Sequence, residues 1–548
     1  MAITLTIDGL INDNNRSNTV NWHMVINIVN RLQSRIVKAV KQGDKKLIRG
    51  LQRLLKRSYA AKLLAVRRVT SNRGIKTSGV DRVKLNTPQA KWQEAQQLNQ
   101  MDYIPRPLKR IYIPKKNGKK RPLGIPTQKD RCEQALELSA LDPIAECTAD
   151  KCSNGFRKKR CVQDAIDGCY NALRRKGSAE WILEGDIKGC FDNINHDWML
   201  ENIPCSKDKL RLWLKAGYME KGMFRPTIAG TPQGGIISPT LSNTALDGLE
   251  KMLSSKFKKN QKVHMVRYAD DFIITGKSKE LLESEIKPVV KSFLLERGLE
   301  LSEEKTKLTH INDGIDFLGF NIRKYKGKLL TKPSKTAIVG IKDKIRKTFK
   351  DNKMAKTDNL IKKLNSIIRG WGNFYRYSAA SHTFGGIGHA IWEMSWKWSK
   401  RRHPKKSLNW IKSKYYRRKE GKDWVFGERK GKAKLFNIGA IPIQRHVKIK
   451  GEANPYDSEW KSYFSYRRLR NNKKNIFESK QDYLWTIQKG ICPRCRTSLD
   501  NDEQWHVHHL IPKNEGGSSK VNNLELLHET CHKQIHCLNS VGGILLDA

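Results

Sequence analysis

Residues 264–276 read HMVRYADDFIITG, and this stretch decides the fold. Val266 and Phe272-Ile273-Ile274 have the β-branched and aromatic character of buried strands, so the pattern predicts a hairpin with Tyr268-Ala269-Asp270-Asp271 at its turn. Removing two adjacent carboxylates from water is costly unless cations compensate, and divalent metal ions are natural compensating cations. A solvated β-turn is the alternative interpretation, which these four residues alone would favour.

A third carboxylate follows a second apolar strand. Residues 181–194 read WILEGDIKGCFDNI, in which Trp181-Ile182-Leu183 leads to Asp186. Phosphoryl transfer by two metal ions needs carboxylates from separate segments to hold the ions roughly 3.5–4 Å apart. We therefore expect Asp186 and Asp270 to bridge two Mg²⁺ ions. Asp271 is expected to support them, and Asp192 to be structural.

With these residues in place, the chain resembles the reverse transcriptases, whose palm carries a strand-borne aspartate and a Tyr-x-Asp-Asp hairpin. Three further segments resemble the group II intron-encoded proteins and occur in the order of that family: KRIYIPKKNGKKRPLGIPTQKDR at 109–131, GTPQGGIISPTLSN at 230–243 and GIDFLGF at 314–320. The resemblance covers nearly the full chain. It implies a multidomain α+β protein with a right-hand polymerase (fingers and palm), an α-helical thumb or maturase domain, and a C-terminal ββα-metal HNH module.

Composition limits the class of partner. The 548 residues include 106 Lys and Arg against 54 Asp and Glu, and the net charge of +52 implies a polyanionic partner. Solvated helix faces can explain individual lysines but not this total. A chain of this length is expected to fold as several domains.

Location follows from what the sequence lacks. No continuous apolar stretch is long enough to span a membrane, and the first residues, MAITLTIDGLINDNN, do not have the pattern of a secretory signal. Eleven mostly scattered cysteines indicate a reducing compartment. We therefore expect no membrane partner and a cytoplasmic, nucleoid-associated protein of a bacterium, with an organellar matrix as the alternative.

Five regions are predicted along the chain. They are a basic helical extension and the start of the fingers at 1–100, the fingers and palm at 101–322, the thumb or maturase domain at 323–411, a basic DNA-binding region at 412–475, and a zinc-containing HNH endonuclease at 476–548. Apolar residues from Val25 to Tyr59 recur at helical spacing, which predicts helices in the first region. A partly disordered basic linker is the alternative interpretation of the fourth.

A basic hairpin is predicted before the palm. Ile111-Tyr112-Ile113 and Leu123-Gly124-Ile125 read as strands around Asn117-Gly118, which is a strong turn signal. A triphosphate needs cationic donors, and the resemblance to the fingers of reverse transcriptases implies that Lys109, Lys115 and Arg121 contact the incoming deoxynucleoside triphosphate. A flap that binds only the template backbone is the alternative.

Three further nucleotide-binding residues follow from the resemblance. Phe191 lies five residues after Asp186, where the family places an aromatic plate beneath the sugar, although a core Phe fits equally well without the family match. Gln233 sits in a Gly- and Pro-rich loop before a helix expected to start near Pro239. Lys305 matches a lysine proposed to protonate pyrophosphate, and a surface lysine paired with a neighbouring glutamate is the alternative.

The segment from residue 359 to 406 interleaves aromatic and basic residues and closely resembles maturase domain X, a helical thumb that binds intron RNA and promotes splicing. Aromatic residues at helical spacing are more often core than ligand platforms, so most of the tryptophans are expected to be buried. The arginines are the better candidates for RNA contact. These arginines are Arg369, Arg376, Arg401 and Arg402.

The last seventy residues contain two groups of metal-ligating side chains. Cys492-x-x-Cys495 and His528-x-x-Cys531 have the paired spacing of a tetrahedral structural Zn²⁺ site. The family usually has cysteine where His528 stands, so Cys537 is an alternative fourth ligand.

The histidines between and after these ligands resemble the HNH nuclease motif. By that resemblance His509 activates water as general base, and a divalent ion such as Mg²⁺ lies on the scissile phosphate. The ion is held by His508, His532 and His536, and Asn523 braces the loop that orients His509. A purely structural zinc module is the alternative.

Together these features predict a group II intron-encoded protein that combines an RNA-dependent DNA polymerase, a splicing maturase and an HNH DNA endonuclease. Its expected partners are the cognate intron RNA, a target DNA and deoxynucleoside triphosphates. Two rival interpretations are a splicing factor with a decayed polymerase and a homing endonuclease acting alone. The intact Asp186, Asp270 and Asp271 argue against the first, and the large polymerase and maturase portion argues against the second.

Overall fold

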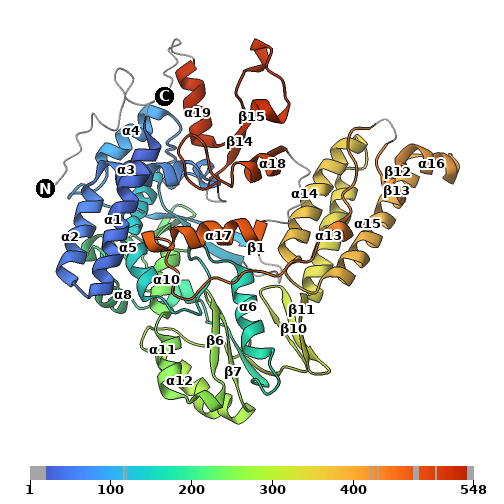
Figure 1. Ribbon diagram of the computed structural model, residues 1–548. Coiled ribbons are helices and arrows are strands. Elements are labelled where there is room, and N and C mark those ends of the chain that lie inside the picture. The colour runs from blue at the N-terminus through green and yellow to red at the C-terminus, as the bar shows by residue number, and fades with distance from the viewer. Residues whose placement is uncertain are drawn as a thin grey trace.

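A computed structural model describes most of the chain (Figure 1). The described residues are 20–114, 118, 120–419, 422–428, 431–472, 480–499 and 503–539. Lys115 and the Asn117 turn residue lie outside them. No helix in these ranges is both long and apolar enough to cross a membrane.

The N-terminal region is helical, as its apolar periodicity predicts. Val25, Val29 and Ile36 recur on one face of the first helix and are buried. They join a core with the long fifth helix, and α1 and α3 both pack against it. The helices of this layer are α1 (Trp22–Gln42), α2 (Lys45–Arg57), α3 (Tyr59–Thr70), α4 (Pro88–Gln97) and α5 (Gln128–Thr148).

A four-stranded sheet with the order β2-β1-β4-β5 follows this layer. Its first two strands form the predicted hairpin, with Ile111 paired to Leu123. The strands are β1 (Leu108–Pro114), β2 (Lys120–Ile125), β4 (Tyr218–Glu220) and β5 (Met223–Arg225).

The central sheet has the order β6-β7-β3-β8 and is antiparallel throughout. Alternate residues of its strands enter different cores: Leu183 and Ile274 face one, whereas Ile182 and Ile273 face the other. The sheet is therefore covered on both faces, which explains its continuous apolar runs. Its strands are β3 (Trp181–Gly185), β6 (His264–Tyr268), β7 (Asp271–Gly276) and β8 (Lys307–His310).

Helices cover the two faces of this sheet. One face packs on a core to which α8 (His196–Asn202), α9 (Lys207–Leu214), α10 (Ser238–Leu246), α11 (Leu249–Lys256) and α12 (Lys287–Leu295) contribute. The other face is covered by α6 (Val162–Leu173), which packs on β6. The short helix α7 (Cys190–Asn193) follows β3 directly.

A small sheet with the order β11-β10-β9 leads into a helical bundle, which lies at the right of Figure 1. The strands are β9 (Ile315–Phe317), β10 (Phe320–Tyr325) and β11 (Lys328–Pro333), and the helices are α13 (Lys335–Asp351), α14 (Thr357–Tyr375), α15 (Ser381–Arg402) and α16 (Leu408–Tyr415). Trp398 is buried as expected, whereas Trp371, Trp392 and Trp396 are only partly buried against the same core.

The core of the bundle continues past residue 411, where the sequence suggests a boundary. Tyr416 and Phe426 belong to the hairpin of β12 (Tyr416–Lys419) and β13 (Lys422–Phe426). Both pack in the same core as α14, together with Ile438 and Ile441. The first part of the predicted basic region is therefore an integral part of the bundle.

The rest of that region returns to the central sheet rather than forming a loose linker. Asp164 near the start of α6 is fully buried and accepts hydrogen bonds from Arg467 Nη2 at 2.6 Å and from the Ile449 backbone at 2.8 Å. His446 Nε2 lies 3.0 Å from the same carboxylate. Arg467 lies on α17 (Lys461–Asn472), which crosses the middle of the molecule in Figure 1. These contacts join segments that are about 300 residues apart.

The C-terminal module lies beside the N-terminal helices in Figure 1. Arg67 of α3 forms a nearly buried ion pair with Glu503 at 2.8 Å, and Gln534 Nε2 donates to the Val20 carbonyl at 3.1 Å. The elements of the module are α18 (Lys480–Ile487), β14 (Trp505–His509), β15 (Leu524–His528) and α19 (Glu529–Asn539). Strands β14 and β15 pair antiparallel, and α19 packs on both.

Candidate functional sites

The predicted hairpin is present, with its carboxylates at the tip. Tyr268 of β6 pairs with Asp271 of β7, so that Ala269 and Asp270 form a two-residue turn. Ala269 has φ of 58°, the positive value that tight hairpin turns between twisted strands require. The turn therefore fixes Asp270 and Asp271 at one end of the central sheet.

Asp186 reaches the same end from the neighbouring strand. Gly185, the last residue of β3, pairs with Phe272, so Asp186, the residue that follows β3, lies beside the hairpin tip. A Cβ atom at Gly185 would overlap the Phe272 ring, which explains why glycine stands before Asp186. The Asp186 carbonyl accepts a hydrogen bond from the Ser302 backbone at 2.8 Å.

The three carboxylates influence one another electrostatically. Burial, and next the charge of Asp186, raise the pKa of Asp270. Burial and the charges of Asp270 and Asp186 raise the pKa of Asp271 to about 6. Clustered carboxylates whose ionisation is opposed by burial and by one another form a donor set suited to hard divalent metal ions. This chemistry fits the predicted magnesium site.

A buried arginine that sequence reasoning missed supports the hairpin from below. Arg267 of β6 is 1% exposed and forms an ion pair with Asp247, and its Nη1 lies 3.2 Å from Asn243 Oδ1. Asn243 Nδ2 donates in turn to the Gly155 carbonyl at 2.8 Å. A Cβ at Gly155 would overlap the Ala269 backbone, so this segment packs directly under the turn. The sequence does hold a signal for this arginine, because a charged residue there interrupts an otherwise apolar strand.

Two of the predicted cationic residues act on the carboxylates. Lys305 Nζ donates to Asp186 Oδ2 at 2.6 Å. The positive charges of Arg121 on β2 and of Lys305 oppose the rise in the pKa of Asp270. Lys109 is exposed on β1, where its backbone pairs with Ile125, and within the described residues no hydrogen bond or ion pair joins it to the carboxylates. Lys115 lies outside the described residues.

Phe191, in the short helix α7, and Gln233, in the loop before α10, lie in adjoining segments. The Thr231 backbone donates to the Phe191 carbonyl at 2.6 Å, and the Phe191 ring meets Phe156 edge to face at 6.1 Å. Gln233 Nε2 donates to Asp192 Oδ2 at 3.2 Å, and the Gln233 carbonyl accepts from the Gly124 backbone of β2. Asp192 thus has a structural partner, as the sequence suggests, and Gln233 links the β1–β2 hairpin to the loop after β3.

The arginines of the bundle differ in accessibility. Arg376 is 1% exposed, so its predicted contact with RNA is wrong for the folded protein. Arg402 donates to the Ala355 carbonyl at 2.6 Å and lies over the Trp398 ring. Arg369 lies over the Phe436 ring. Arg401 remains exposed, because it follows the outer face of α15.

The C-terminal module brings Cys492, Cys495, His528 and Cys531 together. All four are buried, and their ligand atoms lie within 4.8 Å of one another. Hydrogen bonds from Cys492 and Cys531 lower the pKa of Cys495, which favours the thiolate form that binds metal. His528 Nδ1 lies 3.3 Å from Cys495 Sγ, so it fits as the fourth ligand. The Cys537 side chain lies outside the described residues.

A second cluster forms between β14 and α19. The ligand atoms of His508, His532 and His536 also lie within 4.8 Å of one another. Burial and the neighbouring charges, first that of His536, lower the pKa of His532 to about 4, so its imidazole is neutral at pH 7 and has a free lone pair. The His506 ring, which sequence reasoning missed, lies 5.2 Å from the His532 ring. The sequence does hold a signal for His506, because it lies two residues before His508 and residues two apart face the same side of a strand.

His509 is the last residue of β14 and Asn523 directly precedes β15, so both lie where the connecting loop joins the two strands. Asn523 is buried, donates to the carbonyls of Ile511 and Ser518, and accepts from the Ile511 backbone at 2.8 Å. It therefore fixes the loop that follows His509, as the sequence predicts. His509 Nε2 lies 3.3 Å from Ser519 Oγ.

Four protein-family models match the chain. They are described as reverse transcriptase (RNA-dependent DNA polymerase) at 113–322, N-terminal domain of reverse transcriptase at 18–98, group II intron, maturase-specific domain at 338–416, and HNH endonuclease at 492–537. The palm carboxylates lie in the first of these ranges, and the two Cys and His clusters lie in the last.

Curated relatives point the same way. The group II intron-encoded protein LtrA of Lactococcus lactis subsp. cremoris is 33% identical over 53% of this chain and 61% of its own length. Protein YkfC of Escherichia coli (strain K12) is 34% identical over 50% of this chain and 83% of its own length. An uncharacterized 91 kDa protein in the cob intron of Schizosaccharomyces pombe is 27% identical over 58% of this chain and 49% of its own. The chain thus spans 61% of the length of LtrA.

Proposed function

Because the chain belongs to the group II intron-encoded proteins, a family with reverse transcriptase and maturase domains, we propose that it copies RNA into DNA, assists intron splicing and nicks DNA. The central sheet and the β1–β2 hairpin correspond to the palm and fingers of a right-hand polymerase. The bundle of α13 to α15 corresponds to the thumb or maturase domain.

In the polymerase, Asp186 and Asp270 would hold two Mg²⁺ ions, with Asp271 in support. Bound ions would activate the primer 3′-hydroxyl and stabilise the leaving pyrophosphate. The protein's own part is to hold the carboxylates in place: Gly185 lets β3 lie against Phe272, and Arg267 anchors the turn through Asp247. Rigid support of this kind keeps reacting groups aligned.

The nucleotide would enter between the tip of the β6–β7 hairpin, which carries Asp270 and Asp271, and the β1–β2 hairpin of the fingers. The charge of Arg121 opposes the rise in the pKa of Asp270, and Arg121 is proposed to bind the phosphates of a triphosphate placed there. Lys109 and Lys115, which belong with Arg121 to the predicted basic hairpin of the fingers, are proposed to assist in binding the triphosphate. Phe191 is proposed as the plate under the sugar that would exclude a 2′-hydroxyl, and Gln233, fixed by Asp192, as a ribose or template contact.

RNA binding is proposed for the bundle and the N-terminal helices. The net charge of +52 requires a polyanionic partner, and the intron RNA is the partner that fits a maturase domain. Within the bundle, exposed Arg401 is the best candidate for a phosphate contact, whereas Arg376 serves the core.

The C-terminal module is proposed as a ββα-metal HNH endonuclease with two metal sites. Cys492, Cys495, His528 and Cys531 would hold a structural Zn²⁺, because thiolates and imidazole in a closed set of four suit that ion. His508, His532 and His536 would hold a divalent ion such as Mg²⁺ on the scissile phosphate. His509 would then accept the proton of the attacking water, and Asn523 would hold its loop.

The observation that carries the polymerase proposal is the convergence of Asp186 with Asp270 and Asp271 at one end of a sheet buried on both faces. Its test is the extension of an oligo(dT) primer on poly(rA) by the purified protein with Mg²⁺ and dTTP. Incorporation that requires Mg²⁺ is expected. No incorporation by the folded wild-type protein would leave the decayed-polymerase interpretation in its place.

A further inference from the structure

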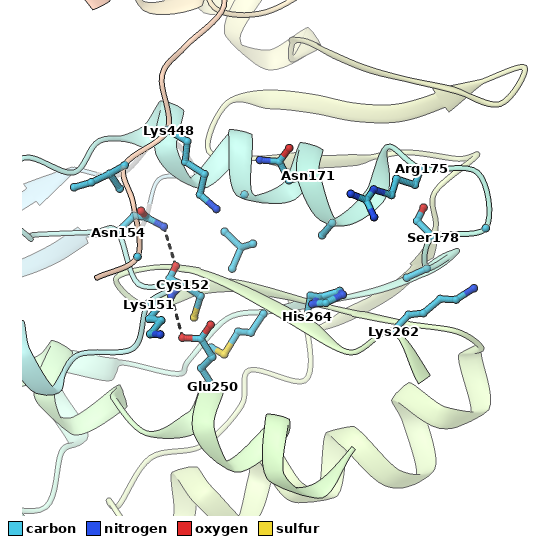
Figure 2. Close-up of a pocket in the computed structure, with 18 of the residues that line it drawn as sticks. Lys151, Cys152, Asn154, Asn171, Arg175, Ser178, Glu250, Lys262, His264 and Lys448 are labelled. Carbon is cyan, nitrogen blue, oxygen red and sulfur yellow. Dashed lines mark hydrogen bonds between the residues drawn. The ribbon is translucent and has the colours of Figure 1, made fainter. Parts of the chain in front are cut away.

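A cavity of about 540 Å³ opens on the side of the central sheet (Figure 2). It lies between α6 and the edge strand β6, and residues 448–451 of the connector close one end. None of the carboxylates and histidines assigned to the polymerase or the nuclease lines it.

The floor of this cavity is apolar. Val266 and Met265 of β6, Ile449 of the connector and Ala179 are buried beneath it. A Cβ atom at Gly168 of α6 would lie 3.3 Å from Val266, so the glycine keeps this floor open. A cavity of this volume with an apolar floor suits a flat organic group rather than a bare inorganic ion.

Its rim is cationic. Arg175, Lys176, Lys262 and Lys448 line the cavity, and in the described part of the chain none of these four side chains makes a hydrogen bond or an ion pair. Figure 2 shows Lys448 reaching down from the connector at one end and Arg175 at the other. The Lys448 amine lies within 3.6 Å of a Cβ built on Gly168, directly over the floor.

The lining carboxylate of Glu250, and Asp167, which interacts electrostatically with Lys448, offset only part of this positive charge. Glu250 accepts a hydrogen bond from the Cys152 backbone at 3.0 Å, which Figure 2 marks. Lys151, a fifth lining cation, is the one that has a carboxylate partner, Glu452 at 2.7 Å. The charge of the cavity is therefore strongly positive, and it favours a ligand that carries phosphate.

Two lining side chains could read a base. Asn171 is exposed on α6, its side chain makes no hydrogen bond within the described residues, and its amide offers both a donor and an acceptor. His264 is exposed at the start of β6 and offers a flat ring. Asparagine amides pair with base edges, and histidine rings stack on bases in nucleic-acid complexes.

We propose that this cavity binds a nucleoside phosphate, with the base on the Val266 floor and the phosphate at Lys448 or Arg175. The ligand is either one nucleotide of a bound RNA strand or a free nucleotide, since the two have the same chemistry. The inference goes beyond the proposed polymerase and nuclease, because the site is separate from both.

The test compares variants in buffer without Mg²⁺, which removes Mg²⁺-dependent binding at the palm. The probes are a short labelled single-stranded RNA, followed by fluorescence anisotropy at several salt concentrations, and AMP, followed by calorimetry. Lys448→Glu should weaken binding of at least one probe about tenfold and, for RNA, reduce the salt slope by about 1. Lys279→Glu is the matched control, because Lys279 is exposed on the same domain but does not line the cavity.

Variants that fill the cavity test whether binding needs the cavity itself or only the basic surface around it. Gly168→Leu adds volume over the floor without changing the charge, and Ala172→Phe does so at a half-buried lining position should the first variant fail to fold. A filled variant should lose the same binding as Lys448→Glu. Loss of AMP binding identifies a free nucleotide as ligand, and loss of RNA binding alone identifies a strand.

The proposal is overturned if the filled variants bind both probes like the wild type, or if Lys448→Glu behaves like Lys279→Glu. Primer extension on poly(rA) should be unchanged in the cavity variants, which shows that they are folded. Because that assay depends on the palm and the binding assay on the cavity, either proposal can fail without the other.

Discussion

Lys305 Nζ lies 2.6 Å from Asp186 Oδ2, so the lysine forms an ion pair with a carboxylate that we propose as a metal ligand. The hydrogen bond to Asp186 raises the pKa of Lys305, which remains cationic at neutral pH. The charge of Lys305 also opposes the mutual repulsion of Asp270 and Asp271. We interpret the lysine as a counter-ion of the three carboxylates.

Lys305→Ala should therefore lower the thermal stability of the protein in EDTA, because three carboxylates lose a nearby cation. Mg²⁺ should restore more stability to this variant than to the wild type. DNA synthesis should also slow if Lys305 protonates pyrophosphate. Differential scanning fluorimetry with and without Mg²⁺ measures the first effect, with Lys307→Ala on β8 as the control. Equal Mg²⁺ stabilisation of wild type and Lys305→Ala would disprove the counter-ion role.

The raised pKa of Asp271 predicts that the stability of the folded protein depends on pH. The pKa of Asp271 is raised to about 6 in the fold, so the folded protein holds a proton that the unfolded chain releases near pH 4. Without metal, stability should therefore fall as pH rises from about 4 to about 6 and then level off. Mg²⁺ binding requires the ionised form, so apparent Mg²⁺ affinity should rise through the same range.

Asp271→Asn is the variant that isolates this effect. It should reduce the dependence of melting temperature on pH without Mg²⁺, because one of the titrating groups is gone. Asp247, with its pKa raised to about 6, and Glu94, with its pKa raised to about 7, still titrate. Melting curves at intervals between pH 4.5 and 7.5, chosen to bracket the pKa of about 6, provide the measurement. A wild-type protein that gains metal-free stability across this range would contradict the assignment.

Gly185→Val should disturb the polymerase site through packing alone. A side chain at this position meets the Phe272 ring, and overpacking of a buried site costs about 1–3 kcal/mol. DNA synthesis should fall more than stability suggests, because β3 carries Asp186 directly after this residue. Gly340→Ala on α13 is the matched control, since a Cβ there meets nothing within 4 Å. Urea denaturation and primer extension report the two effects, and full activity in Gly185→Val would refute the packing argument.

The two clusters of the C-terminal module should respond differently to substitution. Cys492→Ser should remove zinc and unfold the module, because a structural site supplies folding energy. His509→Ala should keep the zinc content and the fold but stop DNA nicking. Zinc stoichiometry beside a strand-specific nicking assay separates these results, and reverse transcription on a supplied primer should persist in both variants. Normal nicking by His509→Ala would remove it as the general base.

Features set by short stretches of sequence could be predicted well. The YADD turn, the strand before Asp186 and the paired Cys and His spacings each lie within a few residues, so local pattern determined them. The β1–β2 hairpin and the helices of the N-terminal layer follow from the same kind of signal.

Features that depend on distant partners could not be predicted. Arg267 reads as a surface residue until Asp247 appears beneath it, and Arg376 reads as an RNA contact until the bundle closes around it. The basic region after residue 411 has no periodicity, yet Arg467 docks it on Asp164 across about 300 residues. Such pairings depend on tertiary placement that no local pattern encodes.

The central claim is that Asp186, Asp270 and Asp271 form a polymerase centre that is separate from the RNA-binding surfaces. The most direct measurement compares wild type and Asp270→Ala in RNA-templated primer extension and in RNA binding, on the same preparations. Asp270→Ala should show no detectable DNA synthesis, while its RNA affinity and melting temperature stay close to those of the wild type. DNA synthesis by the folded variant, or loss of RNA binding together with synthesis, would contradict the account.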